Sequence, residues 1–435
     1  MKKNIFLTII GLTSICQSFK AQSFYFPPTT GTTWDTISPT SLGWCPSRID
    51  SLYNYLDARH TKAFIVLQDG KIALEKYFGT FTVDSIWYWA SASKSLTSTL
   101  IGIAHQDGLL NITDTVSNFL GNSWTSCTTA QERKITIFNL LTMTSGLNDA
   151  LGTPCSNTDT TASCLQYFTN AGTRWAYHTG AYRKLEDVVS TASGMSYNAF
   201  TNNRIGSHIG MTGAWVAQEY YSKPRSMARF GLLALSKGIW ANDTILHDTA
   251  YFHAMTNTSQ NFNLSYGYLW WLNGKASFMA PGLQTVFPQQ LFSNAPTDLY
   301  AALGKNDQKI YIVPSLNMVV VRMGDAAYSS ALAFSQFDNE LWQYIDSLTC
   351  STTSVNEIGK NEKKISIFPN PANTELTVDI QSLRNFKIEV TNLLGEVVVK
   401  QQNQNKIDIS FLTNGIYIVT VRQSQNIYTQ KLIKQ

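Results

Sequence analysis

A serine and a lysine three residues apart, Ser91 and Lys94, are the side chains of this sequence best suited to do chemistry. A serine hydroxyl is a poor nucleophile unless a base lies within hydrogen-bonding distance. Residues three apart share one face of a helix, so the lysine amine would lie beside the hydroxyl. The N-terminus of a helix also favours negative charge. The pair therefore predicts nucleophilic catalysis by Ser91, with Lys94 as the base.

The surroundings of this pair matter, because Ser-x-x-Lys alone also arises by chance as a solvated surface pair. Aromatic and small residues precede Ser91, and apolar residues follow it at Leu96, Leu100 and Ile103. This helical spacing continues to about Gly108 and predicts a helix with the pair in its first turn.

Length, charge and the first residues bound the class of protein. The chain has 435 residues, enough for two or three domains, and its net charge of +4 is too small to indicate nucleic acid or a membrane surface. The basic pair Lys2-Lys3, apolar residues 5–15 and Ala21 predict a secretory signal peptide over residues 1–21. Later segments are too short or too polar to cross a membrane. We therefore expect an exported protein.

Export permits disulfide bonds, and five cysteines remain after the predicted cleavage. Cys45 and Cys350 flank the predicted catalytic core, so a bridge between them would tie its two ends together. Cys155 and Cys164 form the other candidate pair. No metal site is predicted, because Cys-x-x-Cys pairs are missing and the spacing of metal ligands is not found at His105, His208, His247 and His253.

The elements around Ser91 predict a mixed fold. A helix over 46–60 and a hairpin over 64–77 precede a mainly helical segment over 91–258. Strands near 299–302, 309–313 and 318–322 and a helix over 330–348 follow it. We therefore expect an antiparallel sheet flanked by terminal helices, beside an inserted α-domain, with a substrate cleft between them.

Composition changes after Cys350. A polar linker is predicted over 351–364. Seven short runs of alternating apolar and polar residues, separated by turn residues, fill 365–435. They predict a small all-β sandwich.

Residues 64–324 resemble the serine β-lactamase-related family, which contains class C β-lactamases, penicillin-binding peptidases, esterases and 6-aminohexanoate-oligomer hydrolases. Five landmarks occur in the family's order: LQDGK at 67–71, SASK at 91–94, LLTMTSGL at 140–147, WAYHTGAY at 175–182 and ALG at 302–304. The resemblance implies a β-lactamase-like fold over 22–350. It also implies that Ser91 is acylated, that Lys94 acts as its base and that Tyr177 passes a proton to the leaving group. The N–H groups of Ser91 and Lys305 would bind the oxyanion.

The resemblance also implies a substrate-binding edge, formed by His178, Thr179, Ala302 and Gly304. Glycine at 304 would let the substrate approach the strand closely. His178 could instead be a hydrogen-bonded structural residue. Two positions depart from the family, because Thr179 replaces an asparagine and Ala302 replaces a basic residue or histidine. Losing a cation removes a reason to prefer an anionic substrate, although Lys305 lies next to the site.

Residues 365–435 resemble the C-terminal sorting domain of the type IX secretion system of Bacteroidetes. The matching features are IFPNPA at 367–372, LGE at 394–396, LTNGIY at 412–417 and a basic end. This implies the secretion machinery as a partner and a secreted or surface-attached product; a plain adhesive β-module is the alternative.

These features predict a secreted serine hydrolase that needs no cofactor and acts on an ester or small amide. One alternative is a β-lactamase or a D-Ala-D-Ala peptidase. Another is a catalytically silent binding or sensor module that retains the fold.

Overall fold

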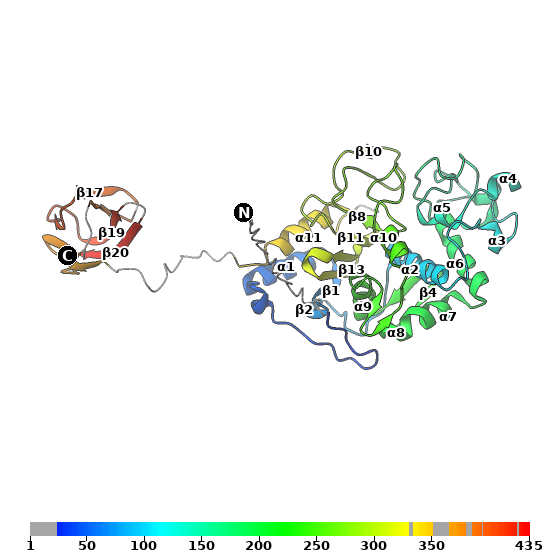
Figure 1. The fold of residues 1–435 in the computed structure, drawn as a ribbon, viewed down its shortest axis with the longest axis horizontal. Helices are drawn as coiled ribbons and strands as arrows, with labels where there is room; N and C mark the ends of the chain where they lie inside the picture. The colour runs from blue at the N-terminus through cyan, green and yellow to red at the C-terminus, as the bar shows by residue number, and fades with distance from the viewer. Residues whose placement is uncertain (1–23, 330–333, 351–364, 380–384, 394, 424–425) are drawn as a thin grey trace, which may run out of the picture. The chain divides into compact units, whose positions relative to one another are not determined.

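The computed structural model describes residues 24–329, 334–350, 365–379, 385–393, 395–423 and 426–435. The predicted signal peptide and linker lie outside these ranges. The chain divides into two compact units, residues 1–350 and 351–435 (Figure 1).

A six-stranded antiparallel sheet forms the centre of the first unit, with strand order β2-β1-β13-β12-β11-β8. Its strands are β1 (Thr61–Gln68), β2 (Lys71–Tyr77), β8 (Trp271–Leu272), β11 (Tyr300–Gly304), β12 (Gln308–Val313) and β13 (Met318–Gly324). The first two strands of the unit therefore pair with its last three, as predicted. This arrangement confirms the predicted β-lactamase-like fold.

Helices cover both faces of this sheet. The terminal helices α1 (Pro46–Ala58) and α11 (Gln336–Asp346) pack together, and the rings of Tyr55 and Tyr344 stack with centroids 4.5 Å apart. The opposite face is covered by α9 (Pro224–Leu235), which contacts β1, β12 and β13. A helix from within the inserted segment thus covers the second face of the sheet, which the sequence patterns did not predict. The sheet together with α1, α9 and α11 is called the β-lobe below.

The inserted segment is mainly helical, as predicted, but it also contains short strands (Figure 1). The elements that border the site are η2 (Ala90–Ala92), α2 (Ser93–Gln106), α5 (Ile137–Leu141) and α6 (Thr179–Ser193). The other helices are η1 (Pro39–Leu42), α3 (Ser117–Leu120), α4 (Thr129–Glu132), η3 (Ala162–Cys164), α7 (Tyr197–Thr201), η4 (Asn202–Gly206), α8 (Ser207–Ile209), α10 (Thr249–Met255), η5 (Lys305–Asp307) and η6 (Pro314–Leu316). The other strands are β3 (Trp87–Tyr88), β4 (Gly213–Val216), β5 (Glu219–Ser222), β6 (Ile239–Trp240), β7 (Asp243–Thr244), β9 (Phe278–Met279) and β10 (Val286–Phe287).

Both candidate disulfide bonds are present, Cys45–Cys350 and Cys155–Cys164, and Cys127 is a free thiol. The first joins the two ends of the unit. The second closes a short loop next to the segment that carries Tyr177.

The second unit consists of two antiparallel sheets, β14-β15-β18 and β17-β16-β19-β20. Their strands are β14 (Ser366–Phe368), β15 (Glu375–Asp379), β16 (Lys387–Thr391), β17 (Val397–Gln402), β18 (Lys406–Asp408), β19 (Gly415–Gln423) and β20 (Asn426–Lys434). Leu376, Val390 and Val419 are among the residues of a separate apolar core. The predicted small all-β domain is confirmed. Within the described part of the chain, no helix is long and apolar enough to span a membrane.

Candidate active site

Ser91 lies in the η2 turn, directly before α2 begins at Ser93. The turn is tied to the neighbouring strand β5, because Trp89 N–H donates to the Tyr220 carbonyl at 2.8 Å and Tyr220 N–H donates to Ser93 Oγ at 2.9 Å. Ala90 has φ 48°, a left-handed conformation that costs a non-glycine residue on the order of 1–3 kcal/mol. The backbone that presents Ser91 is therefore strained and held from both sides of the turn.

The amine of Lys94 lies within hydrogen-bonding distance of the proposed nucleophile. Lys94 Nζ donates to Ser91 Oγ at 2.9 Å, and the lysine is 2% exposed. The amine lies 4.1 Å from the ring centroid of Tyr182 and 4.9 Å from that of Tyr177. Burial holds the pKa of Lys94 well below its usual value, and the charge of Arg183 lowers this pKa further. The neutral amine, which can accept a proton from Ser91, is thereby favoured.

Tyr177 lies against Lys94 in a group of aromatic rings. Its ring stacks on Trp271 with centroids 6.0 Å apart. Its hydroxyl is buried and has no hydrogen-bond partner among the described residues. Burial raises the pKa of Tyr177, while the nearby Ser91 hydroxyl lowers it. The structure thus brings together Ser91, Lys94 and Tyr177.

Asn157, which the sequence analysis missed, holds the Tyr177 segment in position. Its Nδ2 donates to the Tyr177 carbonyl at 2.9 Å and its Oδ1 accepts from Thr179 N–H at 2.9 Å. Gly180 N–H donates to the Asn157 carbonyl at 2.7 Å. A Cβ at Gly180 would lie 1.9 Å from the Asp159 carbonyl oxygen, so only glycine permits this approach. The one available signal was the position of Asn157 inside the Cys155–Cys164 loop.

His178 caps helix α6. Its Nδ1 accepts from Ala181 N–H at 3.2 Å, and the side chain is 1% exposed. Burial lowers the pKa of His178 to about 4, against an opposing effect of Asp149, so the ring is neutral at pH 7. This contact accounts for the histidine structurally. Substrate contacts by His178 and Thr179 stay predictions.

The edge of β11 runs beside the Ser91 turn. In the described ranges β8 pairs only with Tyr300 and Ala301, which leaves residues 302–304 without a strand partner on that side. Ala302 is 1% exposed, whereas the side chain of Lys305 is exposed. The charge of Lys305 makes a small contribution to the lowered pKa of Lys94.

The structure gives a reason for glycine at position 304 that the sequence analysis did not give. A Cβ at this position would lie 2.3 Å from the Trp89 carbonyl oxygen and 3.2 Å from Ala90 Cβ. The glycine therefore lets the strand approach the nucleophile's own turn. Substrate binding by Ala302 and Gly304, and oxyanion binding by the N–H groups of Ser91 and Lys305, stay predictions.

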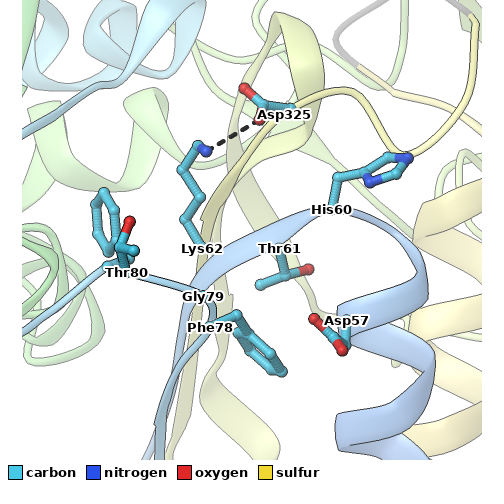
Figure 2. A pocket seen from close by; sticks show the side chains of 9 residues that line it. Asp57, His60, Thr61, Lys62, Phe78, Gly79, Thr80 and Asp325 are labelled. Carbon is cyan, nitrogen blue, oxygen red and sulfur yellow. Dashed lines mark ion pairs between the residues drawn. The ribbon is translucent and has the colours of Figure 1, made fainter.

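A separate pocket of about 300 Å³ contains none of these residues. It lies where β1 begins and β13 ends, and Lys62 pairs there with Asp325 at 3.0 Å beside His60 and Asp57 (Figure 2).

The comparisons with known proteins identify the family and the fold of this chain. Residues 49–329 match the Beta-lactamase family, and the chain belongs to that family, whose members are typically serine hydrolases. Residues 366–435 match the secretion system C-terminal sorting domain, which indicates secretion or cell-surface location and an interaction with the secretion machinery. No curated protein matches the chain significantly.

Solved structures share the fold at low identity. A provisionally named 6-aminohexanoate-dimer hydrolase from Bacillus anthracis has a TM-score of 0.56 and 20% identity, over 74% of this chain and 88% of its own. A provisionally named β-lactamase from Bacteroides dorei has a TM-score of 0.56 and 17% identity, over 70% and 99%. A penicillin-binding protein homologue from Caulobacter crescentus has a TM-score of 0.53 and 12% identity, over 70% and 98%.

Proposed function

We propose that this protein is an exported serine hydrolase that cleaves an ester or small amide through an acyl-enzyme. One observation carries the proposal: Lys94 Nζ lies 2.9 Å from Ser91 Oγ in a buried site that favours the neutral amine. Tyr177 supplies a third group next to this pair. A silent binding module would have no need to keep a lysine desolvated beside a serine.

The reaction follows from these positions. Ser91 Oγ attacks the substrate carbonyl carbon and its proton moves to Lys94 Nζ. The N–H groups of Ser91 and Lys305 stabilise the negative charge on the carbonyl oxygen. The tetrahedral intermediate collapses, the bond to the leaving group breaks, and the proton reaches that group through Tyr177. Water then attacks the acyl carbon and Lys94 Nζ takes its proton. The bond from that carbon to Ser91 Oγ breaks, and the proton passes from Lys94 to Ser91 Oγ, which restores the free enzyme and releases the carboxylic acid.

The charge around the site supports a neutral substrate. Ala302 offers no cation at the position where the resemblance to β-lactamases and penicillin-binding peptidases implies a basic residue or histidine. A groove of about 510 Å³, lined by both apolar and polar side chains, includes Trp175, whose ring centroid is 6.3 Å from that of Tyr177. The arginine in this groove, Arg174, is already paired with Asp149 at 2.7 Å. We therefore expect neutral esters to be better substrates than carboxylate-bearing β-lactams or peptides.

Intact mass spectrometry tests the proposal. The protein is incubated with p-nitrophenyl butyrate or, separately, with benzylpenicillin, and then quenched in acid. We expect a butyryl adduct on the native protein and none on Ser91→Ala. Ser98→Ala is the matched control, because Ser98 lies on the same helix and its buried hydroxyl has no partner among the described residues. An unlabelled native protein, or a labelled Ser91→Ala variant, would refute the mechanism. A persistent penicillin adduct would instead favour a penicillin-binding peptidase.

Export is the second part of the proposal. The predicted signal peptide would direct the chain across the inner membrane, and the C-terminal sorting domain would direct it across the outer membrane. Truncation after Cys350 should leave the hydrolase active but retain it in the periplasm. Surface delivery of the truncated protein would contradict this role for residues 365–435.

A further inference from the structure

The residue that carries the second proposed oxyanion donor, Lys305, begins a strained turn. It is followed by Asn306 with φ 58° and Asp307 with φ 57°, two consecutive left-handed residues, neither of them glycine. Asn and Asp tolerate this conformation better than other non-glycine residues, but usually as single residues, so two in succession need support from their surroundings. The direction of the Lys305 N–H therefore depends on what holds this turn.

Arg322, on the neighbouring part of β13, holds it from the interior of the β-lobe. Its side chain is fully buried and each of its five N–H groups has an acceptor. Nη1 donates to the carbonyls of Asn306 and Asp307, at 3.0 Å each. Both carbonyls of the strained turn are thus bound by a single nitrogen of one planar group.

The other three donors of Arg322 fasten it to the opposite side of the lobe. Nη2 donates to the carbonyls of Arg59 at 2.7 Å and Asp325 at 2.9 Å, and Nε donates to Thr61 Oγ1 at 3.1 Å. The side chain of Asp325 is in turn paired with Lys62, at the edge of the pocket in Figure 2. The guanidinium therefore joins the turn after β11 to the start of β1 and the end of β13.

Charge and burial distinguish this residue from an ordinary core residue. A buried cation is costly, and replacing buried ionic groups with apolar ones is often neutral or stabilising. Burial lowers the pKa of Arg322 to about 10, which still leaves it charged at pH 7. The neighbouring strand residues Val320, Val321 and Met323 are apolar and fully buried. If position 322 only had to fill the interior, an apolar residue like these neighbours would serve there.

We propose that Arg322 is a positioning residue for the hydrolase reaction, because it fixes the strained turn 305–307 so that the Lys305 N–H points at the developing oxyanion. This rests on the proposed function of Ser91. It predicts a defect in stabilising the tetrahedral state, with little change in ground-state binding.

The test compares Arg322→Lys with Arg229→Lys. Arg229 is a matched control, because it is also buried, also donates to two backbone carbonyls (Ile209 at 2.6 Å and Pro28 at 2.8 Å) and lies on α9. The full chain is assayed for kcat and KM with p-nitrophenyl butyrate and for inhibition by phenylboronic acid, which forms a tetrahedral adduct on a nucleophilic serine. Melting temperatures are measured in parallel.

For Arg322→Lys we expect kcat and the affinity for phenylboronic acid to fall together, by about 10- to 100-fold, with KM changed less than about 3-fold. Arg229→Lys should lower the melting temperature but leave kcat and boronate affinity near native values. Equal losses in both variants, or a normal kcat in folded Arg322→Lys, would overturn the proposal.

A second pair of variants decides the matter if Arg322→Lys does not fold. Asn306→Gly leaves Arg322 intact but makes the turn flexible, and it also removes the hydrogen bond from Asn306 Nδ2 to Tyr88 Oη. Tyr88→Phe removes that bond alone. We expect the kcat and boronate losses in Asn306→Gly and not in Tyr88→Phe, and native values in both would overturn the proposal. Failure of the native protein to acylate at Ser91 would instead refute the proposed function.

Discussion

Replacing Gly304 with alanine tests how closely the strand β11 must approach the nucleophile's turn. The added Cβ would lie 2.3 Å from the Trp89 carbonyl oxygen. Ordinary contact requires the two backbones to separate by roughly 1 Å. Both partners are backbone groups, so no side chain can rotate away. Both backbones are also held in place, because the Trp89 N–H is bound to Tyr220 and Gly304 is paired with Gln308 on β12. The strand and the turn must therefore move apart.

The consequence for catalysis follows from that displacement. The two proposed oxyanion donors belong to Ser91, two residues after Trp89, and to Lys305, directly after Gly304. A misplacement of about 1 Å at reacting groups can cost about 100-fold in rate, or about 2.7 kcal/mol of transition-state stabilisation. Overpacking of this kind also destabilises the fold by about 1–3 kcal/mol. The Ser91–Lys94 pair lies within one turn and should be less affected.

Ester hydrolysis, Ser91 acylation by mass spectrometry and thermal unfolding are measured for Gly304→Ala. Gly152→Ala is the control, because that glycine is exposed, has no atom within 4 Å of the added Cβ and does not have a left-handed φ. We expect Gly304→Ala to acylate slowly while Gly152→Ala behaves as the native protein. A native kcat/KM in Gly304→Ala would refute the conclusion that this close approach sets the oxyanion geometry.

Two further predictions concern Glu186 and Asn157, which are not among the proposed catalytic residues. Burial raises the pKa of Glu186 from 4.5 to about 8, so the folded state keeps a proton that the unfolded state loses. The contribution of Glu186 to the free energy of unfolding therefore falls as pH rises from 4.5 to about 8. The melting temperature of Glu186→Gln should fall less over this range than that of the native protein. Parallel curves of melting temperature against pH would contradict this assignment. Asn157→Ala should lower kcat/KM for the ester about 10-fold and reduce stability by about 1–3 kcal/mol, because it leaves the Tyr177 carbonyl and the Thr179 N–H without their side-chain partner. Unchanged kinetics in this variant would show that Tyr177 is held without Asn157.

Features with a local signal were predicted well from the sequence. The Asp69-Gly70 turn has φ values of 51° and 84° and joins β1 to β2, as the spacing of the two apolar runs predicted. The final helix was predicted from residue 330, but α11 begins at Gln336 because Ser335 and Asp338 form a capping box. Residues 330–333 lie outside the described ranges. Periodicity located this helix, while the capping side chains set its first residue.

Several features that depend on contacts distant in sequence, and that no motif marks, were not predicted. An amphipathic pattern identifies α9 as a helix but does not indicate which surface it covers. A Cβ at Gly231 would lie 2.5 Å from Val319 and 3.0 Å from Ile310, two strand residues that the pattern of the helix does not reveal. The role of Arg322 depends on hydrogen-bond acceptors at Arg59 and Thr61, which lie 263 and 261 residues away in the sequence. Asn157 likewise carries no motif. Such residues are identified by their partners, and one sequence does not reveal those partners.

The site combines two kinds of geometry that should respond differently to substitution. The Ser91–Lys94 contact is made within one helical turn, so it survives small movements between the lobes. The proposed oxyanion donors come from different elements, and their spacing depends on Gly304 from one side and on Arg322 from the other. Both substitutions would thus displace the same pair of donors, so their free-energy effects should not add. If Gly304→Ala and Arg322→Lys each lower kcat about 100-fold by displacing the same donors, the double variant should lose far less than the product of about 10,000-fold. A full product would mean that the strand and the turn stabilise the transition state independently.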